Sequence, residues 1–310
     1  MNSELDGAIA ALPSTHFGLR WDHAAELDEV TDLVHSCEEQ DAIEPRTSPS
    51  ELALRLARRN HSALLAGRDA AGQLRTVAFV HWVPADLPGT AVLHAYVDPA
   101  WRGRGIGRQV LAWQDSVAIA ALSDHATGLV GVTIPATLID RRRLYTAAGF
   151  SSRGRVHSYV AVLAAQHLDV AEPAEQIVPL RELPAHLSGD LPRSVVDFVA
   201  SGMYAYDRLA IADPDASHMA LRNGAVVGSI LVHLTEDSEG ESVALINDLR
   251  PGSAAAPAIL ASAYRALREQ QIEKAYLRIT PESLGTWEDP VRACGGTPSG
   301  AHVLYSIEWP

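Results

Sequence analysis

The chain has 310 residues, of which 47% are hydrophobic, and a formal net charge of −13. This length favours two domains, and the negative charge argues against a nucleic-acid partner. The chain has no apolar run long enough to span a bilayer, and its acidic start lacks the features of a signal peptide. Cys37 and Cys294, the two cysteines, lie far apart, which argues against a disulfide scaffold or a cysteine-built zinc site. We therefore expect a cytoplasmic protein that binds neither membrane nor metal.

The first half alternates short strands and helices. A strand over 16–20 precedes a helix whose apolar residues recur at helical spacing from Leu27 to Val34. A second helix is predicted to begin at Ser48, with Pro49 at the first helical position and Glu51 closing a capping box. The later predicted elements are strands over 62–66, 75–83 and 91–97, a helix over 108–122, a strand over 129–134, a helix over 140–148 and a strand over 156–163.

A similar order recurs after a polar stretch, 164–175, which lacks periodicity and is interpreted as a linker. The second set comprises strands over 177–180, 219–222, 226–234, 242–249, 275–279 and 303–309, with helices over 193–203, 256–270 and 283–293. This repeat predicts two copies of one α/β unit, residues 1–163 and 176–310. Each copy is expected to be a mixed, mostly antiparallel sheet flanked by helices.

One stretch joins a buried strand to a helix through a glycine-rich loop, Arg102-Gly-Arg-Gly-Ile-Gly107. Glycines let backbone amides approach an anion closely, and a helix N-terminus offers free N–H groups and the positive end of its dipole. Arg102, Arg104 and Arg108 add charge, so the loop is predicted to hold a pyrophosphate. A dinucleotide fingerprint requires glycine where Arg108 stands, and a P-loop requires Gly-Lys-Ser/Thr, so neither motif fits.

The first half, over about 16–163, resembles the GNAT superfamily of N-acetyltransferases in two motifs. The loop is similar to the family's acyl-CoA signature, Arg/Gln-x-x-Gly-x-Gly/Ala. The segment from Leu144 to Phe150 resembles the family's Leu-Tyr-x-x-x-Gly-Phe. The resemblance implies a tandem GNAT-like protein whose first copy is catalytic. It also implies acetyl-CoA as co-substrate, attacked directly by an amine in a ternary complex.

The resemblance also implies roles for individual residues. The strand before the loop is expected to separate from its neighbour, so that the backbone of Ala95, Tyr96 and Val97 bonds pantetheine. The pyrophosphate is expected on Arg102, Gly103, Arg104, Gly105, Ile106, Gly107 and Arg108. Tyr145 matches the tyrosine that protonates the departing thiolate, although a tyrosine packed in the core is the alternative.

His94 is the leading candidate for the catalytic base, since its imidazole titrates in the right range. His81, on the neighbouring strand, and Glu44 are alternatives, and His94 could instead be structural. The family often has Asn and Ala where this chain has Leu138 and Arg141. The run from Arg141 to Arg143 is interpreted as a solvated helix face or, alternatively, as a contact for the 3′-phosphate of CoA.

The second copy lacks these features. Aligning Arg250 with Arg102 puts Ser253 and Ala255 where the loop has glycine, and Trp287 falls roughly at the position of Tyr145. We therefore expect the second copy to keep the fold without the cofactor. The predicted function is acetyl transfer to a small-molecule amine by a monomer or homodimer. The alternatives are a non-catalytic acyl-CoA-binding protein and an N-acetyltransferase acting on proteins or peptides.

Overall fold

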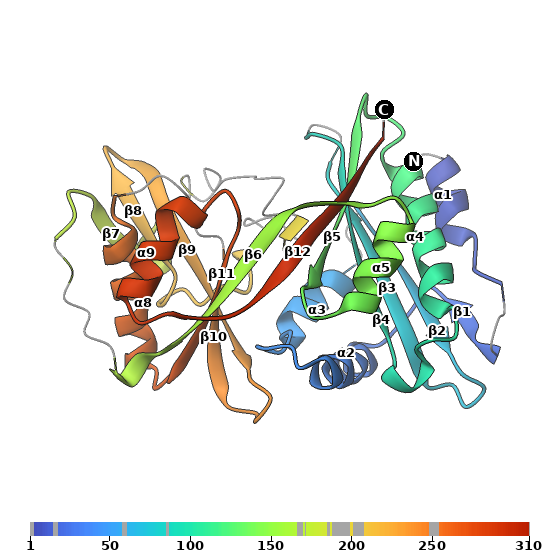
Figure 1. Cartoon of the computed structure of the whole chain (residues 1–310). Helices are drawn as coiled ribbons and strands as arrows, with labels where there is room; N and C mark the ends of the chain where they lie inside the picture. The colour runs from blue at the N-terminus through green and yellow to red at the C-terminus, as the bar shows by residue number, and fades with distance from the viewer. Residues whose placement is uncertain are drawn as a thin grey trace. The chain divides into compact units, whose positions relative to one another are not determined.

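Figure 1 shows the computed structural model, which describes residues 3–14, 18–57, 61–84, 87–165, 170, 172–184, 187, 199–200, 208–247 and 254–309. The chain divides into two compact units. Unit 1 is Met1–Arg153 with Leu304–Pro310, and unit 2 is Gly154–Val303. The sequence places the boundary in the polar stretch 164–175, of which residues 166–169 and 171 lie outside the described part. The contacts instead divide the chain at Arg153, inside a strand.

Unit 1 is built on a mixed sheet in which sequential strands are neighbours. The first four, β1 (Arg20–Asp22), β2 (Ser62–Arg68), β3 (Leu74–Trp82) and β4 (Thr90–Val97), pair antiparallel. β5 (Gly128–Pro135) then runs parallel to β4. β12 (Thr297–Trp309) follows β5, and its residues from Leu304 onward belong to unit 1.

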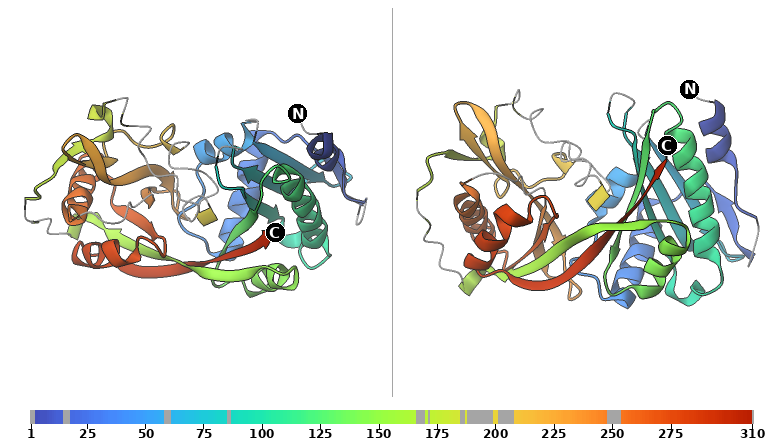
Figure 2. Two further views of the ribbon diagram at one scale, coloured as in Figure 1. Left: turned by 90° about the horizontal axis from the view of Figure 1, so that it is seen from above. Right: turned by 45° about the horizontal axis from the view of Figure 1, so that its top comes forward.

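Helices cover both faces of this sheet (Figures 1 and 2). α2 (Leu27–Asp41) and α3 (Pro49–Leu56) pack Val34 and Leu52 against Val77 and Phe79 of β3. α4 (Ile106–Ala121) contacts β3 and β4 from the opposite face and carries α1 (Ser3–Ala10) on its outer side. α5 (Ile139–Ala147) lies beside α4. The sheet is therefore buried between two layers, which explains the long apolar runs of β3 and β4.

The start of α3 illustrates how local sequence sets an element. The Ser48 side chain accepts a hydrogen bond from the Glu51 amide at 3.1 Å, and Pro49 takes the first helical position, as predicted. The Glu51 carboxylate, predicted to close a capping box, instead accepts a hydrogen bond from Arg55 at 2.6 Å. Arg55 is thereby held inside the molecule, with only 6% of its side chain exposed.

Unit 2 repeats the mixed arrangement, and β10 and β11 are its parallel pair. Its strands follow one another in the order β6 (Ser151–Val162), β11 (Lys274–Ile279), β10 (Ser242–Asn247), β9 (Ala225–Glu236), β8 (His218–Arg222) and β7 (Gln176–Pro179). The helices of unit 2 whose full extent lies within the described residues are α8 (Ala256–Glu269) and α9 (Leu284–Ala293). Short 3₁₀ turns are η2 (Pro99–Trp101) in unit 1 and η3 (Leu163–Ala165) and η4 (Leu180–Glu182) in unit 2.

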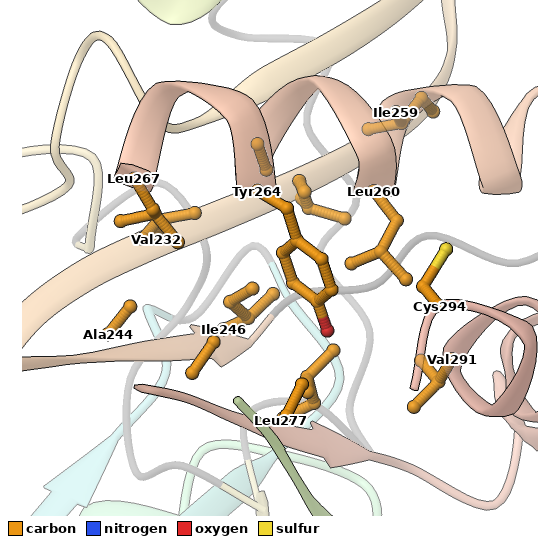
Figure 3. Packing of buried hydrophobic residues seen from close by; sticks show 14 of the residues in the cluster. Val232, Ala244, Ile246, Ile259, Leu260, Tyr264, Leu267, Leu277, Val291 and Cys294 are labelled. Carbon is orange, nitrogen blue, oxygen red and sulfur yellow. The ribbon is translucent and has the colours of Figure 1, made fainter. Parts of the chain in front are cut away.

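The core of unit 2 lies between α8, α9 and the strands beneath them. Figure 3 shows the Tyr264 ring reaching from α8 into a cluster with Leu260, Ile246, Leu277 and Cys294. The predicted fold class, two α/β units with mixed, mostly antiparallel sheets, is confirmed. The helix predicted over 193–203 falls almost wholly outside the described residues. Within the described residues, every helix is too short or too polar for a membrane crossing.

Candidate functional site

The parallel strands β4 and β5 part before β4 ends. Their register runs from Thr90–Leu129 to Val92–Gly131 and stops there, although β4 continues to Val97. On its other edge β4 stays paired with β3 as far as Val97. β4 therefore turns one unpaired backbone edge toward a gap, which is the separation that the family resemblance implies.

Only alternate residues of β4 present backbone groups to this gap. The Asp98 N–H donates to the Arg75 carbonyl at 2.8 Å, which sets the phase of the β3–β4 ladder. Because residues two apart in an antiparallel strand use the same edge, Tyr96 bonds toward β3, whereas Ala95 and Val97 face the gap. The predicted pantetheine contact of Tyr96 therefore needs correction, since β3 occupies its backbone. Ala95 and the Val97 amide remain candidates, whereas the Val97 carbonyl accepts hydrogen bonds from Arg102 and Cys37.

The loop after β4 passes through two glycines in the left-handed region. Gly103 has φ +77°, and Gly105, the N-cap of α4, has φ +88°, conformations that other residues rarely adopt. Within the described part of the chain, the amides of residues 103–107 have no hydrogen-bond partner. These amides lie at the positive end of the α4 dipole. The loop geometry therefore fits a pyrophosphate.

Arg102 does not point its guanidinium at a free anion site. Its Nη1 and Nη2 bind the two oxygens of Asp41 at 2.5 and 3.1 Å, and its Nε donates to the Val97 carbonyl at 3.1 Å. Arg141 reaches the same carboxylate at 3.4 Å. The Asp41 side chain is only 5% exposed. Arg102 therefore anchors the end of β4 to α2, and because its amide donates to the Pro99 carbonyl at 3.4 Å, the backbone of Arg102 does not supply the predicted anion contact either.

The other two loop arginines remain near solvent. Arg104 lies over the Trp101 ring, 4.7 Å from its centroid, and donates to the Ala100 carbonyl at 3.0 Å. The Arg108 side chain is exposed and makes no hydrogen bond or ion pair with the described residues. Of the three arginines, Arg108 is thus the one whose charge is free for a phosphate.

The loop also lies against α5. A Cβ at Gly107 would meet the Leu144 side chain at 3.4 Å, so this glycine lets the start of α4 approach α5. Arg142 donates to the Tyr305 hydroxyl at 3.1 Å and to the Ala136 carbonyl, and only Arg143, 78% exposed, lies on a solvated face. The interpretation of the whole arginine run as a solvated face was therefore wrong.

A helix-ending motif positions Tyr145. α5 ends with Gly149 at φ +94°, where the Gly149 amide bonds the Thr146 carbonyl and the Phe150 amide bonds the Tyr145 carbonyl, each at 3.1 Å. The Tyr145 and Phe150 rings meet edge to face at 5.3 Å. Burial raises the pKa of Tyr145 to about 12. The hydroxyl is therefore protonated at neutral pH.

His94 lies on the sheet face that α2 and α3 cover. Its ring is 6.1 Å from that of His81, and the Nε2 atoms of both rings are buried without a hydrogen-bond partner among the described residues. Burial lowers the pKa of His94 well below its usual range and that of His81 to about 3, and Arg55 adds to both effects. Both imidazoles are therefore neutral, which argues against His94 as a strong proton acceptor.

Unit 2 ends α9 with the same motif and places a different residue in it. The Gly295 amide bonds the Arg292 carbonyl at 3.0 Å, and the Gly296 amide bonds the Val291 carbonyl at 2.8 Å. Counting back from the glycine as in α5, the position of Tyr145 is held by Val291 and not by Trp287. Val291 has no hydroxyl and is fully buried. The loop match at Arg250–Ser253 lies outside the described residues.

The structure brings together the gap beside β4, the glycine loop and α5, but it keeps two predicted catalytic residues in different settings. No contact among the described residues joins Tyr145 to His94, and Glu44 is exposed. The described part of the chain also holds no cluster of three or more His, Cys, Asp or Glu side chains that would bind a metal.

Sequence reasoning missed Asp41, Arg55 and Gln114. Asp41 is the last residue of α2, where the helix dipole disfavours a carboxylate, and that anomaly was a usable signal. The buried Gln114 donates to the carbonyls of Phe79 (3.0 Å) and His94 (2.8 Å), and a glutamine on the apolar face of α4 was a second signal. Arg55 gave none, because a Glu–Arg pair four residues apart is typical of helix surfaces.

No protein-family model and no curated protein matches the sequence. Solved structures do match it. A GCN5-related N-acetyltransferase from Sphaerobacter thermophilus has a TM-score of 0.66 at 18% identity, over 96% of this chain and 97% of that one. A GCN5-related N-acetyltransferase from Anabaena variabilis has a TM-score of 0.52 at 12% identity, over 93% of this chain and 72% of that one.

A third match is the GCN5-related glucosamine N-acetyltransferase region of a fungal multi-domain GH3 β-N-acetylglucosaminidase. Its TM-score is 0.66 at 16% identity, and the alignment covers 96% of this chain but 38% of that longer protein. These likenesses extend along nearly the whole chain. Together with the parted strands and the glycine loop, they show that the chain has the fold of the GCN5-related N-acetyltransferases.

Proposed function

We propose that the chain is an N-acetyltransferase that transfers the acetyl group of acetyl-CoA to the amine of a small molecule. The observation that carries this proposal is the parting of β4 from β5 directly before a loop of unpaired amides. The open edge offers backbone partners to an amide-bearing pantetheine arm, and the loop offers them to a pyrophosphate. Solved structures of the same fold that are named N-acetyltransferases support the same reaction class.

The reaction requires little from the protein beyond placement and proton transfer. In the ternary complex the nitrogen lone pair attacks the thioester carbonyl carbon, and the C–S bond breaks. The amine loses one proton, and the departing thiolate gains one. Ala95 and Val97 would hold the pantetheine arm by their backbone, and the amides of residues 103–107, with Arg108, would hold the phosphates.

Tyr145 is proposed to donate the proton to the thiolate. Burial keeps its hydroxyl protonated, and the same burial disfavours a charged thiolate, which increases the demand for that proton. His94 is proposed to accept a hydrogen bond from the amine through its unpaired Nε2. Because its pKa is lowered, the amine should enter as the free base, and the proton should pass onward to water.

A matched pair of glycine variants tests the cofactor site. Gly103 and Gly72 both have positive φ and open space around the site of a new Cβ, so Gly103→Glu and Gly72→Glu carry similar backbone strain. Gly103→Glu adds a carboxylate to the proposed pyrophosphate cradle and should weaken acetyl-CoA binding more than 100-fold by calorimetry. Equal binding by both variants would place the phosphates elsewhere.

Turnover distinguishes an enzyme from a non-catalytic acyl-CoA binder. The protein would be incubated with acetyl-CoA and a panel of small amines while free thiol is followed, with mass spectrometry of the acylated product. Binding of acetyl-CoA without thiol release from any amine would contradict catalysis. Absence of both binding and release would contradict the proposal altogether.

A further inference from the structure

A buried polar cluster lies on the face of β3 and β4 that α2 and α3 cover. It consists of Arg55 from α3, His81 from β3 and His94 from β4, and we call it the Arg55 cluster. The cross-strand neighbours of its histidines, Val92 and Phe79, are buried and apolar. Arg55 is buried, and the two histidines are half-buried with their Nε2 atoms shielded from water, so these polar groups require a reason.

Arg55 has more hydrogen-bond donors than the protein satisfies. Its Nη2 donates to Glu51 at 2.6 Å, and the Nε and Nη1 atoms are buried without a partner among the described residues. The Nε2 atoms of His81 and His94 are in the same condition. Unpaired buried donors on a permanently charged side chain are costly, so water or a ligand must complete them.

The charge of the cluster favours an anionic partner. Both imidazoles are neutral, and among the described residues Arg55 forms an ion pair with Glu51. The other carboxylate of this region, Glu38, is occupied by the Thr47 amide and hydroxyl, and burial raises its pKa. A guanidinium with free N–H groups matches a carboxylate in charge and in shape.

The cluster also lies next to the proposed cofactor groove. His94 immediately precedes Ala95, whose backbone faces the gap between β4 and β5. His94, a member of the cluster, therefore lies one strand position from the backbone that would hold the pantetheine arm. This closeness links the spare donors of Arg55 to the acceptor side of the reaction.

We propose that the Arg55 cluster is an acceptor subsite that binds a carboxylate, so that the amine substrate is an amino acid or another amine that carries a carboxylate. The inference rests on the proposed function and specifies its substrate class. Arg55 is a substrate-binding residue here, with His81 and His94 completing the polar wall. Ordered water that satisfies Arg55 without any ligand is the competing explanation.

A comparison of substrates on the unaltered protein tests this first, so that folding of a variant is not an issue. Amino acids with different spacing between amine and carboxylate, including glycine, β-alanine, 4-aminobutyrate and L-leucine, would each be compared with the corresponding primary amide. The amide keeps the size and removes the charge. We expect kcat/KM for the best acid to exceed that for its amide by roughly 10- to 100-fold.

Variants then assign the effect to Arg55. Arg55→Gln should lower kcat/KM for the best acid to about that for its amide, and Arg55→Lys should restore part of the preference for the acid. Arg68→Gln is the matched control, because it removes a guanidinium of β2 that is bound to Glu29 of α2. This variant should keep the preference for the acid over the amide. Acetyl-CoA affinity, measured for each variant, reports whether the cofactor site is intact.

The outcomes separate this inference from the proposed function. Turnover of amides as fast as acids, or an acid preference that survives Arg55→Gln, would overturn the carboxylate subsite and leave the acetyltransferase in place. Acetyl-CoA binding without turnover of any acid or amide would overturn the subsite together with catalysis.

Discussion

Each unit contains one crossover, in which a strand is followed by a helix and then by a parallel strand, and the two crossovers differ in how far the parallel strands stay paired. In unit 1, β4 leaves β5 after Val92 and runs on with an open edge. In unit 2, the corresponding pair β10 and β11 stays in register through Ile246, one residue before β10 ends. The comparison shows that this fold does not by itself separate the parallel strands, so we expect the proposed cofactor groove only in unit 1.

The helices that follow these strands differ in the same sense. Gln114 and Tyr264 are each the ninth residue of their helix, α4 and α8, and both are fully buried. Gln114 donates to the carbonyls of Phe79 and His94, which are cross-strand partners in β3 and β4. Tyr264 fills an apolar core (Figure 3). At this helix position unit 1 thus has a side chain that hydrogen-bonds to the strands, whereas unit 2 has one that packs in the apolar core.

The largest expected difference between the units concerns their buried tyrosines. Tyr145→Phe removes the proposed proton donor and should lower kcat about 100-fold or more, with acetyl-CoA affinity nearly unchanged. Tyr264→Phe removes the hydroxyl of a buried tyrosine from unit 2 and should leave kcat unaltered. Thiol release under saturating substrates measures both. A similar kcat for Tyr145→Phe and the parent protein would show that Tyr145 serves packing alone.

Two buried aspartates give a second, smaller contrast. Asp41 holds Arg102 at the mouth of the loop in unit 1, and Asp237 holds Lys274 at 2.9 Å in unit 2. Asp41→Asn keeps the shape but loses the charge that fixes Arg102, so the dissociation constant of acetyl-CoA should rise about tenfold. Asp237→Asn should lower stability without changing that constant. Calorimetry on the two variants would contradict this account if their affinities moved together.

Local patterns in the sequence predict much of this contrast. The glycines of the loop and the Gly149–Phe150 ending of α5 act within a few residues, so the crossing and the position of Tyr145 follow from short motifs. The partners of those motifs do not. Asp41 lies 61 residues from Arg102, and such a pairing depends on the assembled fold.

The same limit explains the errors. The sequence comparison put Trp287 opposite Tyr145, but Tyr145 lies four residues before the glycine that ends its helix, and the hydrogen bonds at the end of α9 put Val291 at that position. The prediction that the Tyr96 backbone binds pantetheine was wrong for a similar reason. The pairing of β4 with β3 decides which residues of β4 direct their N–H and C=O groups toward the gap. Membership of Leu304–Pro310 in unit 1 is likewise a long-range property of the chain.

The next largest expected effect is a pH dependence of stability that arises in α4 and not in α8. Burial raises the pKa of Asp115, the tenth residue of α4, to about 6. An unfolded Asp titrates near pH 4, so its contribution to stability is complete below about pH 4 and is lost as the pH rises through about 6. Asp115→Asn should therefore stabilise the protein at pH 8, by about 1–2 kcal/mol after allowance for partial exposure, and should have little effect at pH 4.

Urea unfolding at the two pH values measures this effect. The tenth residue of α8 is Arg265, and Arg265→Gln serves as the matched control, because an arginine does not titrate in this range. Equal stabilisation by Asp115→Asn at both pH values would show that the carboxylate is not destabilised by burial.

The smallest expected effect is on stability, and it concerns Gln114 and Tyr264, the ninth residues of α4 and α8. Its sign is expected to differ between the two units. The Tyr264 hydroxyl is buried without a hydrogen-bond partner among the described residues, so Tyr264→Phe should stabilise the protein by about 1 kcal/mol. Gln114→Leu instead removes two hydrogen bonds to strand carbonyls and should destabilise it by about 1 kcal/mol. Denaturant midpoints for the two variants test the pair. If both variants stabilise the protein, Gln114 destabilises α4 as Tyr264 destabilises α8. The hydrogen bonds of Gln114 would then not stabilise the crossover of unit 1.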